Sequence, residues 1–319
     1  MKSDVAEKHQ YFDIVTNKNS VLRRKVNVES CKHLVVRIFL LVLMVGLAFL
    51  ILFPFLVKLS STFMSVSDTY DSTVGFIPRH FTLANIEYIF RGTDFLKATW
   101  YTLWLSLMVA VGSVISSSLI GYGLAKFKFK GAGLVLVLVV LVLLIPPQTI
   151  MIPMYTRFRY FLGGTMRLTN TMWPMAFMSI TDFGFRGGLY ILIMRQVYKG
   201  IPNELAEAAK VDGASTFRTY ISVMLPLSKS MLTVVLLFAF SWQWTDTFYS
   251  STLFSSYKLL PTVLTTLQSA TITGLGQGTY TKDLCVNAFA LLAVMPLLIL
   301  FVFVQKKFVQ GIESSGIVG

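Results

Sequence analysis

The chain has 319 residues, of which 55% are hydrophobic and 13% are charged, and its mean hydropathy is +0.67. Soluble domains carry roughly 25% charged residues, so this composition excludes an ordinary soluble globular protein and indicates a protein built for lipid. The net charge of +13 admits nucleic acid as a partner, but the basic loops of a membrane protein give the same total, and we expect membrane lipid and no nucleic acid.

The beginning of the sequence predicts a polar tail followed by a membrane span. Residues 1–32 are polar without hydrophobic periodicity, so we expect a flexible or interfacial tail. A basic nucleic-acid-binding arm is the alternative, but four acidic residues interrupt it. The apolar run at about 34–57 is long enough for a hydrocarbon core that needs about 20 residues, and it lacks the small-residue cleavage site of a signal peptide. This run is the first predicted span.

Two further spans are predicted before the middle of the chain. The second, at about 98–125, carries a stripe of small residues at intervals of four that lets a neighbouring helix approach closely. The third, at about 133–155, is interrupted by Pro146-Pro147-Gln148 and Pro153, and we expect this end to line protein or water because proline removes backbone donors. The stripe consists of Ser113, Ser117 and Gly121.

The fourth predicted span, at about 172–196, contains Asp182 and Arg186. Ionisable groups inside a span are costly and mark a pathway or a partner. The two residues are four apart with the acid first, so on a continuous helix they share one face and can pair.

Two spans complete the predicted membrane domain. The fifth lies at about 227–249 and ends in a polar and aromatic group, and the sixth lies at about 284–304. The sequence therefore predicts an all-α integral membrane protein, with a six-span domain at 33–304 and a second tail at 305–319. The group that ends the fifth span is Gln243, Trp244 and Asp246.

The distribution of basic residues predicts the orientation of the chain. With six spans both termini lie on one side of the membrane. Of the 28 Lys and Arg residues, 18 fall in segments on the side of the termini and 9 in the opposite loops. Basic residues favour the cytoplasmic side. We therefore expect a multi-pass protein of a bacterial-type plasma (inner) membrane with both termini in the cytoplasm.

The polar loop at 201–226, between the fourth and fifth spans, reads as two short helices joined by a glycine. Pro202 and Glu204 suit a first helical turn. Gly213 can adopt the left-handed conformation that ends the first helix, and Ser215 is a suitable cap for the next, Thr216 to Met224. Two helices this small bury little surface alone, so we expect the loop to dock on a soluble partner.

The loop contains Glu207-Ala208-Ala209, then Asp212-Gly213-Ala214, then Pro226. With these residues at this spacing it resembles the EAA motif of permease subunits in binding-protein-dependent ABC importers. The family pattern has phenylalanine where this chain has Tyr220 and proline where it has Ser230. In that family the element is the coupling helix, which sits in a cleft of the ATPase subunit. The positions that carry the resemblance, and with it the coupling role, are Glu207, Ala208, Ala209, Asp212, Gly213, Ala214 and Pro226.

The flanks resemble the carbohydrate-importing, maltose-type branch of this family. The similar segments are Phe81–Ile86, Asn170-Thr171, Gly200-Ile201-Pro202, Phe240-x-x-x-Trp244 and the tail Gln305–Gly311. The resemblance implies a second permease subunit, an external substrate-binding protein and two ATPase subunits. The sequence contains no G-x-x-x-x-G-K-[ST] loop, so we expect no enzyme activity, cofactor or metal here and ATP only in the partner subunits.

Two groups are candidates for a substrate path. Asp182 and Arg186 are either a self-neutralised structural pair or a pore site for sugar hydroxyls. Gln243, Trp244 and Asp246 offer an aromatic face with hydrogen-bonding groups, as a pyranose ring requires, although tryptophan at a membrane interface is also an ordinary anchor.

Four alternatives to a permease for neutral sugars remain open. If Asp182 does not neutralise Arg186, an acidic, uronic-acid oligosaccharide is the alternative substrate, because arginine forks suit carboxylates. A permease for a non-sugar solute, a membrane-embedded enzyme and a structural scaffold are the others.

Overall fold

A computed structural model describes residues 3–182, 186–269 and 281–316, with side chains described between 32 and 306 of these ranges. Within them the chain is helical, and its only β-type pairings are two isolated bridges, Met64 with Phe81 and Phe161 with Met166. The chain divides into two compact units, 1–59 and 60–319. The predicted all-α fold is confirmed.

The first unit consists of one long helix, α1 (Ser3–Thr62), whose last turn belongs to the second unit. Its segment Lys32–Thr62 is long and apolar enough to cross a membrane. The backbone of the predicted tail is helical from Ser3 onward, as part of α1, and flexibility of the tail as a whole stays a prediction. An interfacial position of this segment stays a prediction.

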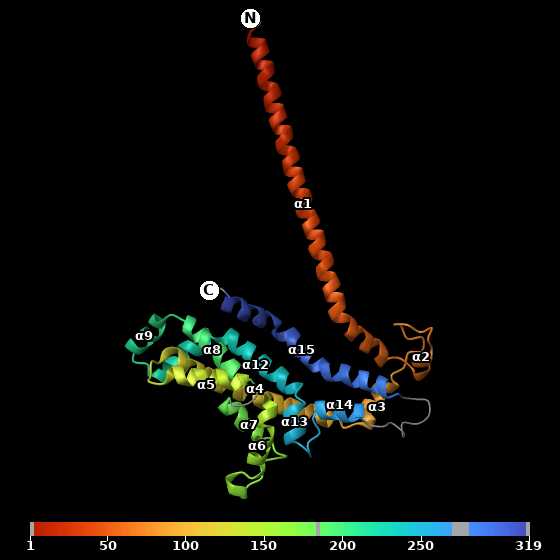
Figure 1. Cartoon of the computed structure of the whole chain (residues 1–319), viewed down its shortest axis with the longest axis vertical. Helices are drawn as coiled ribbons and strands as arrows, with labels where there is room; N and C mark the ends of the chain where they lie inside the picture. Colours follow the sequence, from red (N-terminus) through yellow and green to blue (C-terminus); the bar gives the residue numbers. More distant parts are fainter. Residues whose placement is uncertain (1–2, 183–185, 270–280, 317–319) are drawn as a thin grey trace. The chain divides into compact units, whose positions relative to one another are not determined.

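The second unit contains the remaining helices (Figure 1). They fall into long apolar helices and short connecting ones. In chain order they are α2 (Val66–Tyr70), α3 (Ala84–Gly92), α4 (Phe95–Lys126), α5 (Ala132–Leu144), α6 (Pro147–Arg159), η1 (Leu162–Gly164), α7 (Trp173–Thr181), α8 (Gly187–Gly200), α9 (Asn203–Val211), α10 (Thr216–Thr219), the π-helix η2 (Tyr220–Met224), α11 (Leu225–Leu227), α12 (Lys229–Trp244), α13 (Phe248–Leu253), α14 (Leu260–Ser269) and α15 (Lys282–Gly316).

Helix α4 is the centre of the second unit and packs against α7, α8 and α12. The predicted stripe of small residues explains how closely α8 approaches. A β-carbon added to Gly121 would lie 2.8 Å from the backbone nitrogen of Arg195 and 2.8 Å from Cβ of Met194. A side chain at this position therefore forces the two helices apart. The predicted close approach is confirmed.

The first loop is fixed to the end of α1 by a buried amide. Asn85, in the segment that resembles sugar permeases, donates from Nδ2 to the carbonyl oxygens of Thr62 at 3.0 Å and Met64 at 2.9 Å. Asp68 closes the same loop by accepting from the backbone N–H of His80 at 2.7 Å. That bond and a second one to the His80 ring hold the pKa of Asp68 below its ordinary value.

Three of the predicted spans are not continuous helices. The third is broken after Ile145, where α5 and α6 meet at 100° at the prolines. The fifth, α12, begins after an 80° bend from the preceding helices and ends at Trp244, short of the predicted end at 249. The fourth is divided into two helices: Asp182 is the C-cap of α7, and Arg186 is the N-cap of α8.

Three helices among the described residues are long and apolar enough to cross a membrane, or up to five spans if each bent pair counts as one. The pair α7 and α8 is not among them. Proline breaks a helix because it lacks the backbone N–H, so the sequence predicts the break between α5 and α6. The break at Asp182 contains no proline, so the sequence contains no such sign of it.

Candidate functional site

The predicted helix–glycine–helix is present. Helix α9 ends at Val211, and Gly213 then adopts a left-handed conformation with φ of 82°. Its N–H donates to the carbonyl of Lys210 at 3.0 Å, and the N–H of Ala214 donates to that of Ala209 at 2.9 Å. These bonds satisfy the last carbonyls of α9 as a helix C-cap should. The glycine turn is confirmed.

The second helix of the loop begins where the sequence predicts. Ser215 caps α10 by accepting from the N–H of Arg218 at 3.3 Å. The predicted helix to Met224 changes character at Tyr220, where α10 gives way to the π-helix η2. Pro202 is the N-cap of α9 rather than a residue of its first turn.

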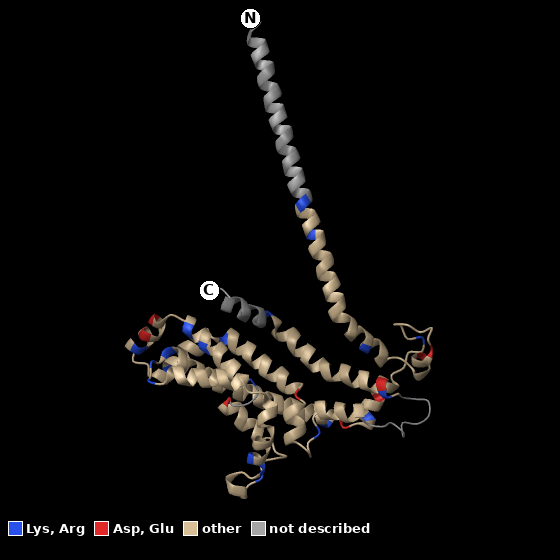
Figure 2. Ribbon diagram, viewed as in Figure 1, with Lys and Arg blue, Asp and Glu red and all other residues tan. Residues whose placement is uncertain are grey.

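Helix α9 buries no residue, and Glu207 and Asp212 are exposed. Large apolar side chains on and beside it are exposed too, with Val211 at 87% and Phe217 at 64%. Figure 2 shows charged residues of both signs around α9. Exposed apolar side chains ringed by charge are typical of a protein-binding surface.

The root of this loop is held by the helices around it. Lys126, the last residue of α4, donates from Nζ to the carbonyl of Ile201 at 2.5 Å and to Oδ1 of Asn203 at 2.8 Å. Tyr220 and Met224 are buried, whereas Pro226 is exposed. The loop is therefore anchored at both ends and exposed between them.

Asp182 and Arg186 do not share a helical face, which corrects the predicted i,i+4 pair. Both have positive φ, 55° and 60°, and they lie on either side of the break between α7 and α8. No ion pair joins them in the part of the chain that the structure describes. The helical geometry on which the pairing depends ends at Asp182.

Each of the two residues has its own surroundings. Asp182 is 4% exposed, and its two carboxylate oxygens have no hydrogen-bond partner among the described residues. Arg186 instead places its guanidinium carbon 3.1 Å from the ring centroid of Trp242 on α12, a cation–π contact. The hydroxyl of the neighbouring Tyr190 is also buried, and no described residue is a hydrogen-bond partner for it.

The second candidate group is largely used to hold the fold. Trp244 is buried, stacks on Phe240, and donates from Nε1 to the carbonyl of Ala293 on α15 at 3.0 Å. Asp246 accepts four hydrogen bonds from the first turn of α13, including 2.7 Å from the N–H of Ser250. Gln243 is buried, and its Oε1 has no partner within the described ranges.

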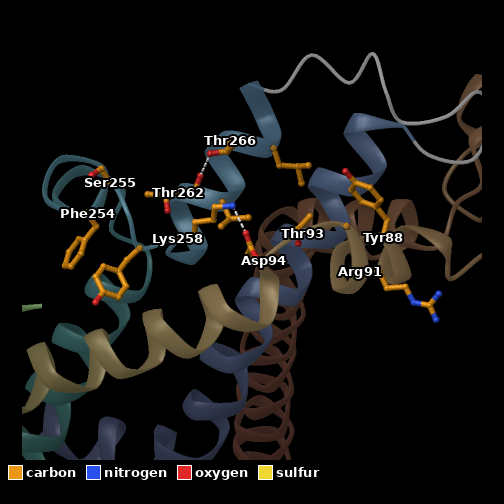
Figure 3. A pocket seen from close by; sticks show the side chains of 13 residues that line it. Tyr88, Arg91, Thr93, Asp94, Phe254, Ser255, Lys258, Thr262 and Thr266 are labelled. Carbon is orange, nitrogen blue, oxygen red and sulfur yellow. Dashed lines mark hydrogen bonds and ion pairs between the residues drawn. The ribbon is translucent and has the colours of Figure 1, made fainter. Parts of the chain in front are cut away.

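A pocket of about 520 Å³ lies at the opposite end of α4 from α9 (Figure 3). Lys258 and Asp94 form an ion pair of 2.5 Å in its wall. The hydroxyls of Thr93 and Thr266 already donate to backbone carbonyls, and Arg91 points away toward Glu87. Few polar groups are thus free to meet a ligand in this pocket. The described residues contain no group of three or more His, Cys, Asp or Glu able to hold a metal ion.

Several residues of the site were not predicted. Trp242 is the partner of Arg186, and Lys126, Ser118 and Tyr198 fix the root of the loop. One sequence signal was available for the last two. A tyrosine where the family has phenylalanine adds a hydroxyl that needs a partner when it is buried.

The family model of the binding-protein-dependent transport system inner membrane component matches residues 117–314. This is more than half of the 319 residues, and the chain belongs to this family. The resemblance carried by the EAA positions is thereby confirmed, and the chain is a multi-pass inner-membrane transport protein.

Curated relatives match nearly the whole chain. The arabinooligosaccharides transport system permease protein AraQ of Halalkalibacterium halodurans is 28% identical over 279 residues, 86% of this chain and 93% of that protein. The galactooligosaccharides transport system permease protein GanQ of Bacillus subtilis is 29% identical over 294 residues, 88% of this chain and 95% of that protein.

A solved structure shares the fold. A chain in the crystal structure of a bacterial ABC transporter involved in the import of the acidic polysaccharide alginate superposes with a TM-score of 0.72. The match covers 85% of this chain and 95% of that one at 20% identity.

Proposed function

We propose that this chain is a permease subunit of an ATP-driven importer for carbohydrate, with an oligosaccharide as its substrate. The chain is a member of the binding-protein-dependent transport family. Its relatives include permeases named for arabinooligosaccharides and galactooligosaccharides, each matched over more than nine-tenths of its length. Those relatives support the oligosaccharide as the substrate class.

The observation that carries the coupling role is the loop at 201–226. It presents exposed charged and apolar side chains on α9, while its root is buried. A rigid, anchored helix with an unburied face suits a cleft on a separate ATPase subunit. Glu207 anchors the contact by charge, Gly213 provides the turn, and Ala208, Ala209, Asp212, Ala214 and Pro226 shape the element between them.

The proposed complex contains two ATPase subunits that bind and hydrolyse ATP, a second, non-identical permease, and an external substrate-binding protein. The proposed topology has six spans with both termini in the cytoplasm, each bent or broken pair of helices counting as one span. The 18 basic residues on the side of the termini support this orientation. It places α9 in the cytoplasm, where ATP is.

The proposed mechanism is transmission of a rigid-body movement. When the ATPase subunits close on ATP, the cleft that holds α9 moves, and the loop passes this movement to α4, α8 and α12. The path then changes from inward-open to outward-open, with Asp182, Arg186, Gln243, Trp244 and Asp246 along it. ATP supplies the driving energy because its binding favours the closed state.

The test is ATPase activity and uptake by the purified complex in proteoliposomes, co-expressed with its neighbouring subunits and supplied with the binding protein. A panel of neutral and uronic-acid oligosaccharides is the probe. We expect ATPase stimulation and uptake with at least one oligosaccharide. No response to any sugar, from a complex that responds to a non-sugar solute, contradicts the carbohydrate proposal.

An acidic oligosaccharide is a second candidate substrate, favoured by one observation. Arg186 is exposed and lies on Trp242 without a carboxylate partner in the described structure, so its charge is available to a ligand. For Arg186→Gln we expect uptake of uronic-acid oligosaccharides to fall at least tenfold while uptake of neutral ones is unchanged. An equal fall for both classes makes Arg186 a structural residue.

A further inference from the structure

Three tyrosines from three separate elements meet under the coupling loop. Tyr122 lies on α4, Tyr198 on α8 and Tyr220 at the start of η2, and all are at most 7% exposed. The ring centroid of Tyr122 lies 5.6 Å from that of Tyr198 and 5.0 Å from that of Tyr220. This aromatic cluster joins the loop to the bundle by packing.

A chain of hydroxyl groups crosses the same place. The Oγ of Ser118 on α4 lies 2.6 Å from the hydroxyl of Tyr198 and 2.7 Å from that of Tyr220. The Oγ of Ser228, just before α12, donates to the hydroxyl of Tyr198 at 3.2 Å. We call these four hydroxyls the hydroxyl joint. It links α4, α8, η2 and the beginning of α12.

The joint gives a reason for the residue at position 220. The EAA pattern has phenylalanine there, and a buried hydroxyl without a partner is destabilising. Here Ser118 is 1% exposed and its oxygen lies between the two tyrosine hydroxyls. The polar substitution in the loop is therefore matched by a polar residue more than a hundred positions earlier in the chain.

Tyr220 also lies where the helix changes its winding. The N–H of Leu225 donates to the carbonyl of Tyr220, which closes the five-residue turn of the π-helix. Such turns are rare and concentrate at functional sites because they are less stable than α-helix. A side chain fixed at the first residue of this turn sets the direction in which the loop leaves the bundle.

We propose that the hydroxyl joint transmits movement of the coupling loop to α4 and α8, with Tyr220 as a positioning residue that acts through Ser118. This rests on the proposed function, since it needs an ATPase that moves the loop. Aromatic packing alone lets a ring slide over its neighbours. The bonds to Ser118 fix both distance and direction, so a displacement of η2 displaces α4.

The variant that tests the joint is Tyr220→Phe, and the chain offers a matched control. Tyr220→Phe removes one hydroxyl while leaving the ring, and Ser118 keeps Tyr198. Tyr122→Phe removes a hydroxyl from the same cluster, where no hydrogen bond to that hydroxyl is found in the described structure. The readout is sugar imported per ATP hydrolysed in proteoliposomes, together with the Tm and subunit composition of the complex.

We expect Tyr220→Phe to assemble normally and to hydrolyse ATP within twofold of the wild type, but to import about threefold to tenfold less sugar per ATP. A hydrogen bond of ordinary net strength accounts for a change of this size. Tyr122→Phe should match the wild type. The double variant Tyr220→Phe/Ser118→Ala should lose less coupling than the two single losses added together, because both changes remove the same contact.

The outcomes separate the two proposals. An unchanged import per ATP in Tyr220→Phe, in a wild-type complex that imports sugar, overturns the joint alone. A fall of equal size in Tyr122→Phe also overturns it, because the loss then does not depend on the hydrogen bond to Ser118. A wild-type complex that shows no sugar-dependent ATPase activity overturns the proposed function and the joint with it.

Discussion

Two buried polar regions of this chain differ in how their groups are partnered. In the hydroxyl joint, Ser118, Tyr198, Tyr220 and Ser228 all share hydrogen bonds. At the break between α7 and α8, the carboxylate of Asp182 and the hydroxyl of Tyr190 are buried with no hydrogen-bond partner among the described residues.

This difference in hydrogen bonding suggests different roles for the two regions, one structural and one functional. A fully bonded polar network rigidifies its surroundings and specifies one arrangement of helices. A buried polar group without a partner is costly, and where it persists a functional role is a reason to keep it. The hydroxyl joint therefore holds the loop to the helix bundle. At the break between α7 and α8, by contrast, Asp182 and Tyr190 have polar atoms that could still bond to a ligand. The predictions below test this comparison, from the largest expected effect to the smallest.

The close contact between α4 and α8 at Gly121, next to the hydroxyl joint, should be the position where a substitution lowers stability most. For Gly121→Leu we expect the largest loss, about 3 kcal/mol or more of stability, because the added atoms meet the backbone of Arg195. Complex yield and Tm in detergent are the measurements. The control is Gly123→Leu, since nothing lies within 4 Å of a β-carbon there. Equal losses in the two variants would show that the close approach of α8 at Gly121 is not the cause, because Gly123 has no such contact.

The two regions should differ in how much stability they lose when a polar side chain is changed. Ser118→Ala removes the hydroxyl that Tyr198 and Tyr220 share as a hydrogen-bond partner, so we expect a loss of about 1–3 kcal/mol, measured as a fall in Tm. Asp182→Asn breaks no side-chain hydrogen bond in the described structure and keeps the size of the side chain, so we expect its Tm to be unchanged while uptake falls. If Asp182→Asn loses as much Tm as Ser118→Ala, the contrast between the regions is wrong.

The turn at Gly213 should tolerate asparagine but not valine. Gly213 has φ of 82° and open space around its β-position, so only backbone strain opposes substitution. We expect Gly213→Val to cost about 1–2 kcal/mol locally and to lower sugar-stimulated ATPase activity. Gly213→Asn should keep most of that activity, because asparagine adopts this conformation readily. Full activity in the valine variant, with normal assembly, removes the turn from the coupling mechanism.

The smallest effect concerns the ion pair in the pocket wall. The hydrogen bond and charge of Lys258 hold the pKa of Asp94 below its ordinary value of 3.8. A carboxylate whose pKa is lower in the folded state than in the unfolded state stabilises the fold at pH values above its unfolded pKa. This stabilisation is lost as the pH falls through the folded pKa. We expect Asp94→Asn to lower Tm slightly at pH 7, by a difference that shrinks as the pH falls below 3.8 and that also shrinks in high salt. A difference that grows on acidification contradicts the assignment.

Features set by local chemistry could be read from the sequence. The turn at Gly213, the cap at Ser215 and the close approach at Gly121 follow from backbone freedom, a side-chain acceptor and a missing β-carbon. Each depends on one residue and its immediate neighbours. The family followed from the spacing of the residues around Glu207.

Features set by contacts between distant segments could not be read in this way. The stacking of Arg186 on Trp242 joins α8 to α12, and the capping of α13 by Asp246 uses a residue expected to face a substrate. The helix break at Asp182 has no proline to signal it. The C-terminal segment Gln305–Gly311, with its resemblance to maltose-type permeases, lies in part outside the described side chains and stays a prediction.

The central claim is that α9 docks on a separate ATPase subunit, and site-directed cross-linking tests it most directly. Val211→Cys, at the 87% exposed last residue of α9, would be treated with a short bifunctional thiol reagent in the assembled complex, in a background with Cys31 and Cys285 replaced. The control is Ile77→Cys, which is 78% exposed in the loop predicted to be external. We predict a cross-link from position 211 to the ATPase subunit, changing with ATP, and none from position 77. No cross-link from 211 in an assembled, ATP-hydrolysing complex would contradict the coupling role of this loop.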